Sequence, residues 1–330
     1  MAFRKPAKKK IGLKVLIYGT YGTGKTIFGL SFPNVALIDS ENGATFYENN
    51  PQFNQNLRLV DNFQSFKELE DTIDDLKDNY EEYGIETLVI DSETKIYENL
   101  KEVVMNVEEK RARRKGGDED DTNLSVRSWG RIKYVGNKLQ NLKIDLTSRG
   151  VNVVSISQAK ELKKKVGDEF IVSGYSHEMN KGSEFDYDIV IQATTETDAI
   201  TGDVKVLNKI LKDRTNTIPK GKVIEGFISF DLWKGYIDGL NGGEKLSTTY
   251  SKEVASTEKD LEKEMVDKEE VLKNRVNEVV KAMDDKTKAK FTSEFKKLKI
   301  NPKQSMTEEQ IDKLEELLDT YENTYEKKVA

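Results

Sequence analysis

The chain has 330 residues, of which 34% are charged, and its net charge is −6, so no overall positive field draws it to nucleic acid. It contains no cysteine and one histidine, which excludes disulfides and metal sites built from Cys or from several His residues. No apolar run approaches the ~18 residues of a membrane helix, so we expect no membrane contact. The basic N-terminus lacks the apolar core of a signal peptide, which predicts a cytoplasmic protein.

The first 240 residues alternate short apolar runs with segments of helical period. Residues 1–10 form a basic arm that we expect to be flexible. Strands that alternate with helices predict an α/β core over 11–240, with a mainly parallel central sheet flanked by helices. Later apolar runs follow one another without long helices and predict an antiparallel extension at one edge. The main predicted strands are 13–19, 34–39, 86–92, 151–157, 187–193, 204–213 and 223–229.

The last part of the chain has a different composition. Residues 241–262 are rich in Gly, Ser, Thr and charged residues, as in a linker. Helical period resumes beyond it, and the capping box formed by Thr307 and Gln310 predicts the start of the last helix. We therefore expect a small helical module over 263–330. Its basic and acidic residues nearly balance, so it is not an obvious DNA-binding module.

The stretch GTYGTGKT matches G-x-x-x-x-G-K-[ST], the pattern of a phosphate-binding loop. A predicted strand precedes it and a predicted helix follows it, which is the context that this motif requires. Lys25 would reach the β- and γ-phosphates, and the Thr26 hydroxyl would bind Mg²⁺. The predicted cofactors are therefore ATP and Mg²⁺. The predicted nucleotide-binding residues are Gly19, Thr20, Tyr21, Gly22, Thr23, Gly24, Lys25 and Thr26.

Three carboxylates follow predicted strands. Asp91 and Asp39 each end an apolar run, and either could hold Mg²⁺ through water. The order of elements favours Asp91, because we expect its strand to lie beside the phosphate-loop strand. Glu41 comes just after the second strand, where a carboxylate could polarise the attacking water, although it could also be an ordinary loop residue.

Two further polar features end later strands. Gln158 closes the run SISQ and would face the crevice where parallel sheets bind ligands, so it could sense the γ-phosphate or simply cap the strand. Lys212 and Arg214 stand two residues apart on a predicted strand and therefore project the same way. Such a pair could stabilise charge on a transferring phosphoryl group, or it could be a solvated sheet edge.

Taken in order, GTYGTGKT, LIDSE, LVIDS, SISQ and LKDR resemble the motifs of RecA-like recombinase and motor ATPases, over about residues 11–230. With LKDRTNTIP, the chain is most similar to bacteriophage RecA-like ATPases of the single-strand-annealing group, which implies a location in the host cytoplasm. The resemblance implies that Glu41 activates water and that Gln158 senses the γ-phosphate and leads into a DNA-binding loop. It also implies that Lys212 and Arg214 reach the nucleotide of a neighbouring subunit, in a ring or filament with shared ATP sites.

Two basic segments lie where that family places its DNA-binding loops. They could neutralise DNA phosphates, or they could be solvated charge runs. Phe170 and Tyr175 could stack on bases in the second segment. The candidate DNA-binding residues are Lys110, Arg111, Arg113, Arg114, Lys115, Lys163, Lys164 and Lys165.

These observations predict a DNA-stimulated ATPase that binds single-stranded DNA and assists strand annealing or exchange in phage recombination or replication. Hydrolysis would reorder residues 159–186 and change their hold on DNA. The C-terminal module would bind a partner, such as a single-strand-binding protein or a replication protein. The alternatives are a helicase or helicase-loading motor, and a non-hydrolysing nucleotide switch that recruits proteins. A small-molecule kinase is disfavoured, because no acceptor site or lid is evident.

Overall fold

The computed structural model describes residues 6–114, 123–167, 169–245, 268–281, 283–301 and 306–329. The chain divides into two compact units at the boundary between residues 251 and 252, and each unit has its own hydrophobic core. Within the described ranges, no helix combines the length and the apolar character needed to cross a bilayer.

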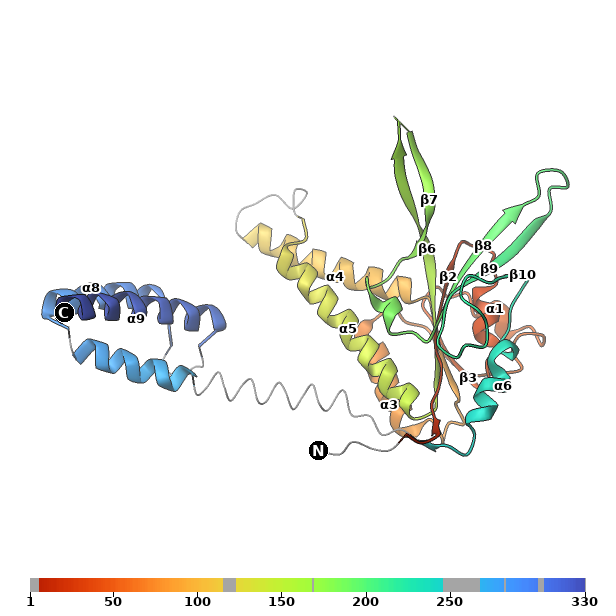
Figure 1. The fold of residues 1–330 in the computed structure, drawn as a ribbon, viewed down its shortest axis with the longest axis horizontal. Helices are drawn as coiled ribbons and strands as arrows, with labels where there is room; N and C mark the ends of the chain where they lie inside the picture. Colours follow the sequence, from red (N-terminus) through yellow and green to blue (C-terminus); the bar gives the residue numbers. More distant parts are fainter. Residues whose placement is uncertain are drawn as a thin grey trace. The chain divides into compact units, whose positions relative to one another are not determined.

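The first unit is built on a nine-stranded sheet, counted over the described residues (Figure 1). Its strand order is β10-β9-β8-β2-β6-β5-β3-β4, and β7 pairs with β6 outside this path. The six strands from β8 to β4 run parallel, β9 pairs antiparallel with β8, and β10 pairs antiparallel with β9. The predicted α/β class and the predicted antiparallel extension are thus confirmed. The strands are β2 (Lys14–Gly19), β3 (Val35–Asp39), β4 (Leu57–Asp61), β5 (Thr87–Asp91), β6 (Asn152–Val166), β7 (Glu169–His177), β8 (Ile189–Thr197), β9 (Val204–Asp213) and β10 (Val223–Glu225).

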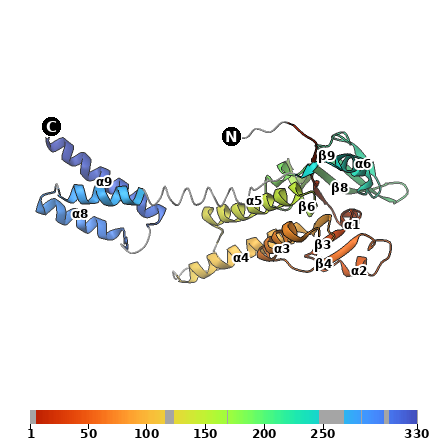
Figure 2. The ribbon, with the colours of Figure 1, turned by 90° about the horizontal axis from the view of Figure 1, so that it is seen from below.

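Helices cover both faces of the sheet (Figures 1 and 2). Successive side chains of β3 show why, because alternate residues of a strand point to opposite faces. Val35 and Leu37 pack in one core with the first and last helices of the unit, and Ala36 and Ile38 pack in the other with three long helices. The first layer holds α1 (Lys25–Leu30) and α6 (Asp231–Leu240). The second holds α3 (Phe66–Asn79), α4 (Glu93–Arg114) and α5 (Val126–Ser148), and the short α2 (Thr45–Glu48) follows β3.

The position of β5 differs from the prediction. The phosphate-loop strand β2 lies between β6 and β8, and β5 is the next strand beyond β6. The expectation that the strand of Asp91 adjoins β2 is therefore wrong, because the chain crosses over through α4 and α5 and returns as β6 between the two strands. All these strands are parallel, so their carboxyl ends still meet at one edge of the sheet.

Two predicted loops are regular structure. Beyond Gln158, β6 continues out of the sheet and pairs with β7 as an antiparallel hairpin, so most of residues 159–186, expected to be a loop, is β-structure. Because α4 continues to Arg114, the first four members of the basic cluster at 110–115 are helical and do not form a loop. Lys115 lies outside the described residues.

The predicted arm and linker meet each other. β1 (Lys9–Lys10) pairs in parallel with β11 (Glu244–Lys245), and the Lys9 ammonium forms an ion pair with Glu244. The end of the arm is therefore a strand, in contrast to the expected flexible segment. Residues 246–262 of the predicted linker lie outside the described residues.

The second unit is helical in its described residues. A helix over 268–281 packs with α8 (Asp285–Lys297) and α9 (Glu308–Val329) around buried Leu272, Phe291 and Leu318. At the start of α9, the Thr307 hydroxyl accepts a hydrogen bond from the Gln310 amide, and the Gln310 side chain accepts one from the Thr307 amide. This reciprocal pair is the capping box that the sequence predicts.

Candidate active site

The phosphate-binding loop joins the end of β2 to the start of α1. Gly22 and Gly24 have φ values of 70° and 76°, in the left-handed region that favours glycine. Gly19 is required for another reason, since a Cβ there would lie 1.9 Å from the carbonyl oxygen of Ala193 in β8. The glycines therefore allow both the turn of the loop and its close contact with the sheet, which places the loop at the N-terminus of α1.

Lys25 and Thr26 are the first two residues of α1. The Lys25 ammonium donates to the carbonyl oxygens of Thr20 (2.6 Å) and Gly19 (3.2 Å), so it lies against the loop itself. Burial lowers the pKa of Lys25, while the carboxylates of Asp91 and Glu41 act in the opposite direction.

Thr26 and Asp91 form the candidate metal site. The Thr26 hydroxyl donates to Asp91 Oδ2 at 2.5 Å. Burial raises the pKa of Asp91 to about 6, and the bond from Thr26 opposes this shift. A hydroxyl and a carboxylate are hard oxygen donors that suit Mg²⁺, which proteins bind through one or two carboxylates together with substrate phosphates. No group of three or more acidic or His side chains in the described residues could hold a metal alone, so the phosphates would complete this site.

The competing aspartate, Asp39, has a different task. Its two carboxylate oxygens accept hydrogen bonds from the backbone amides of Glu41 (3.1 Å) and Ala44 (2.6 Å). Asp39 thereby folds the loop after β3 and presents Glu41 to the pocket. Asp91, which contacts the Thr26 hydroxyl, therefore stays the candidate metal ligand.

Glu41 and Gln158 contact each other. Glu41 Oε1 accepts a hydrogen bond from Gln158 Nε2 at 2.9 Å and another from the Ser92 hydroxyl at 2.6 Å. Glu41 follows β3 and Ser92 follows β5, whereas Gln158 lies within β6 at the point where this strand leaves the sheet. Residues from three neighbouring strands thus meet at one carboxylate. A pocket of about 540 Å³ is bounded by the phosphate loop and by Glu41, Tyr47, Asp91, Ser92, Ile156, Gln158, Ala159, Glu161 and Tyr175. The structure thus brings the predicted loop, metal and catalytic residues of one chain together.

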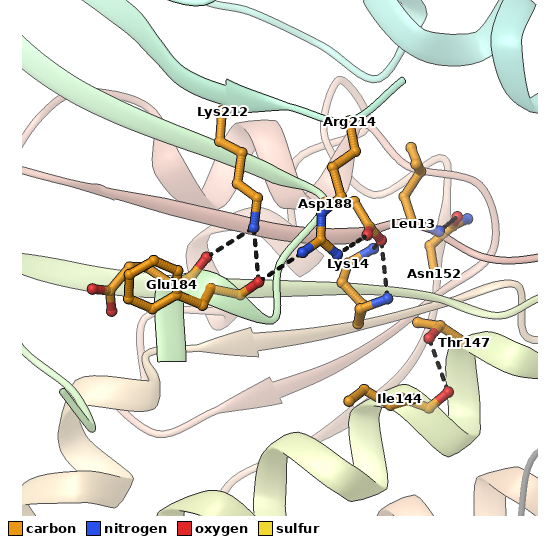
Figure 3. Close-up of polar contacts among 10 residues, drawn as sticks. Leu13, Lys14, Ile144, Thr147, Asn152, Glu184, Asp188, Lys212 and Arg214 are labelled. Atoms are coloured by element: carbon orange, nitrogen blue, oxygen red, sulfur yellow. Dashed lines mark hydrogen bonds and ion pairs between the residues drawn. The ribbon is translucent and has the colours of Figure 1, made fainter. Parts of the chain in front are cut away.

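Lys212 and Arg214 lie elsewhere (Figure 3). The Lys212 ammonium donates to the carbonyl oxygens of Glu184 (3.3 Å) and Phe185 (2.8 Å), at the short helix η1 (Ser183–Phe185). Arg214 donates to the same Phe185 oxygen at 3.0 Å and forms an ion pair with Asp188 at 3.3 Å. The shared acceptor confirms that the two cations project the same way. Neither residue lines the nucleotide pocket of its own chain.

The hairpin of β6 and β7 carries the second basic segment. In its register Lys163 pairs with Val172 and Lys165 with Phe170, so both lysines share a face with Phe170. Glu161 and Tyr175, a pair nearer the sheet on that face, line the nucleotide pocket. Lys164 faces the opposite side. The first basic segment lies on a separate element, at the end of α4.

Sequence reasoning missed Phe227. This residue follows β10, its side chain is 64% exposed, and its ring packs on the phosphate loop, since a Cβ at Gly24 would lie 2.4 Å from Phe227 Cδ1. In the sequence it stands in an apolar run that resembles a core strand. Its placement depends on the path of the chain after β10, which no local pattern reports.

One comparison with known proteins identifies a family. A family model described as an AAA domain matches residues 11–218. The chain belongs to this AAA-domain family. Together with the parallel sheet and the phosphate loop, the family supports a P-loop ATPase of the RecA-like type that binds ATP.

A solved structure is also similar to this AAA-domain protein. It is a KaiC-like protein from the hyperthermophilic archaeon Pyrococcus horikoshii OT3, 17% identical, with a TM-score of 0.41, and the match covers 71% of this chain and 89% of that chain. No residue role follows from this similarity. A search of curated proteins gives no significant match.

Phe227 generates a prediction about the nucleoside end of ATP. Asp91 and Glu41 lie on the β5 and β3 side of the phosphate loop, and Phe227 lies on the β9 and β10 side. A triphosphate whose γ-phosphate is near Glu41 would therefore direct its base toward Phe227. We expect Phe227→Ala to weaken ATP binding about tenfold, since base–aromatic stacking contributes roughly 1–3 kcal/mol.

Calorimetry with ATP and with inorganic triphosphate checks this prediction, because only ATP carries a base. Tyr134→Ala, which removes an aromatic ring that is 62% exposed on α5, is the matched control. Equal losses of affinity for ATP and triphosphate would contradict a stacking role.

Proposed function

We propose that this protein is an ATPase that binds single-stranded DNA along the hairpin of β6 and β7 and couples its hold on DNA to ATP hydrolysis. The observation that carries the proposal is the hydrogen bond between Gln158 and Glu41. Gln158 is the residue at which β6 leaves the sheet to become the hairpin. The candidate base and the root of the candidate DNA element are therefore in direct contact.

The residues of the pocket suit phosphoryl transfer to water. Lys25 would neutralise charge on the β- and γ-phosphates, and Glu41 would accept a proton from the attacking water. Mg²⁺, held by Thr26 and Asp91, would supply charge neutralisation at the same phosphates. The hydrogen bonds from Ser92 and Gln158 orient the Glu41 carboxylate, and orientation of this kind contributes a large part of catalysis.

The same contacts suggest how the nucleotide state reaches DNA. A γ-phosphate near Gln158 offers its amide a charged acceptor that competes with Glu41. A change of partner at Gln158 would shift the start of the hairpin, and Glu161 and Tyr175 on the pocket side would move with it. Because the sequence motifs resemble those of phage annealing proteins, we extend this proposal to strand annealing or exchange during phage recombination or replication.

The catalytic part is tested with Glu41→Gln, which keeps the side chain's size but removes the base. We expect ATP hydrolysis, measured as phosphate release with and without single-stranded DNA, to fall by about 10²–10⁴-fold while ATP binding is kept. Glu48→Gln, an exposed carboxylate in the neighbouring α2, should hydrolyse ATP at the parental rate. Unchanged turnover in Glu41→Gln, or no turnover in the parent, would favour the nucleotide-switch alternative.

The DNA-binding part is tested by replacing Lys163, Lys164 and Lys165 with Gln. We expect weaker binding to an oligonucleotide and a slope of log affinity against log salt that is smaller by about 2, because each lost contact with single-stranded DNA removes about 0.7. Fluorescence anisotropy at several salt concentrations measures both quantities. Replacement of the exposed Lys286, Lys290 and Lys297 of α8 removes the same charge and is the control. An unchanged slope would place the DNA site elsewhere, and ATP-driven duplex unwinding would favour the helicase alternative.

Lys212 and Arg214 support the further proposal that ATP sites are shared between subunits of a homo-oligomer. Both cations lie outside the pocket of their own chain, and the Arg214 side chain is 55% exposed. A neighbour that docks head to tail could receive them at its γ-phosphate, which generates a ring or a filament. In the same assembly the C-terminal module would be left to bind a single-strand-binding or replication protein.

A mixing experiment tests the shared site. The Glu41→Gln variant and a double Lys212→Ala, Arg214→Ala variant should each be inactive alone. Mixed in equal amounts, they should regain a substantial fraction of the parental rate, because some interfaces then combine an intact Glu41 from one variant with intact cations from the other. A mixture that stays as inactive as its components would show that the two cations do not act across subunits.

A further inference from the structure

Lys143, in the middle of α5, is a fully buried cation that the proposed hydrolysis does not use. Its ammonium forms an ion pair with Glu93 and donates to the hydroxyls of Ser155 (3.0 Å) and Tyr187 (2.8 Å). The three donors of the ammonium thus have three partners, and the Tyr187 hydroxyl in turn donates to Glu93 at 3.3 Å. Burial lowers the pKa of Lys143, and Glu93 opposes this shift.

A buried ion pair of this kind calls for a reason other than stability. Removing two charges from water costs free energy that their attraction only partly returns, and apolar residues of similar size are often as stable or more stable. Buried Lys and Glu residues are accordingly rare in protein interiors. We therefore look for the role of this ion pair in the elements that it connects.

The ion pair of Lys143 and Glu93 holds the start of α4. This point of the chain lies next to β5, which ends at Asp91, and contacts β6, which contains Gln158. Glu93 is the first residue of α4 and stands two residues after Asp91. The side-chain hydroxyl of the next residue, Thr94, accepts a hydrogen bond from the backbone amide of Gln158 at 3.0 Å. Its hydroxyl also lies 3.1 Å from that of Ser157, to which the Glu178 amide at the end of the hairpin donates.

We propose that Lys143 and Glu93 are positioning residues that lock the start of α4 against β6, and so hold Asp91 and Gln158 at the distances that Mg²⁺ and the γ-phosphate require. The inference rests on the proposed function, in which Asp91 holds the metal and Gln158 senses the phosphate. Freed of the lock, α4 can shift relative to β6, and the Asp91 carboxylate no longer stays aligned with Thr26. A displacement of about 1 Å at a catalytic group costs on the order of 10²-fold in rate.

The test is the double variant Lys143→Met, Glu93→Leu, which removes both charges and keeps the buried volume. Tyr187 retains Ser155 and Gln140 as neighbours for its hydroxyl, so we expect a folded protein. Lys138→Met, Glu70→Leu is the matched control, since it removes another ion pair that α5 makes, with α3, away from the pocket. ATP binding is measured in EDTA and across a Mg²⁺ titration, and ATP hydrolysis is measured alongside.

We expect the double variant to bind ATP in EDTA within about threefold of the parent, because the phosphate loop is unchanged. Its Mg²⁺ requirement should rise at least about tenfold and its kcat should fall by about 10²-fold. The control should match the parent in all three measurements. A purely structural role would lower the thermal midpoint and leave the Mg²⁺ titration unchanged.

The outcomes separate this inference from the proposed function. If the parent hydrolyses ATP, Glu41→Gln does not, and the folded double variant keeps the parental Mg²⁺ titration, the positioning role is wrong and the ATPase proposal stands. If the parent does not hydrolyse ATP, the ATPase proposal fails, and the Mg²⁺ dependence of binding still decides the positioning role. Should the double variant not fold, Ser155→Ala removes the hydrogen bond that joins Lys143 to β6, and an unchanged Mg²⁺ titration in that variant overturns the inference.

Discussion

Glu41 Oε1 accepts two hydrogen bonds from two other strand ends, and the candidate active site depends on this convergence. It is possible because β3, β5 and β6 are adjacent and parallel, so their carboxyl ends open at one edge beside the phosphate loop. If any of these strands ran the other way, its polar residue would lie about a strand length away from the other two. The parallel arrangement is therefore the condition for Glu41, Asp91 and Gln158 to share one pocket.

The ends of β3 and β5 are also joined to each other by a second set of hydrogen bonds. The Ser40 hydroxyl donates to the Ser92 carbonyl at 2.9 Å and accepts from the Ser92 amide at 2.8 Å, which fixes the loops after β3 and β5 to each other. The Asp39 carboxylate accepts hydrogen bonds from the backbone amides of Glu41 and Ala44 and so fixes the loop that carries Glu41. Local hydrogen bonds thus fix the exposed Glu41 side chain, which would otherwise sample several rotamers. Fixing it costs side-chain entropy, which the hydrogen bonds offset.

The sequence predicts those parts of the site that are local. GTYGTGKT, Asp91 and Gln158 are each a short pattern at the end of an apolar run, and the structure places all of them at the pocket. The insertion of β6 between β2 and β5 could not be predicted, because strand order is a tertiary property that hydrophobic period does not record. The hairpin is missed for a related reason, since the outer part of β6 is charged and the apolar run that begins β7 is exposed, so neither shows the pattern of a strand with one buried face.

Lys212 and Arg214 are the pair for which we propose a role between subunits. Both donate to the Phe185 carbonyl oxygen, a neutral acceptor, and burial together with the nearby Arg214 lowers the pKa of Lys212. A phosphate oxygen carries more negative charge than a carbonyl oxygen and forms the stronger hydrogen bond with a cation. The neutral Phe185 oxygen of η1 offsets the repulsion between the two cations only in part. A negatively charged γ-phosphate in its place would offset this repulsion more fully. Lys212 contacts two neutral carbonyl oxygens, and Arg214 can exchange its bond to the Phe185 oxygen while it keeps its ion pair with Asp188. The contacts within one chain therefore align both side chains without opposing a role between chains.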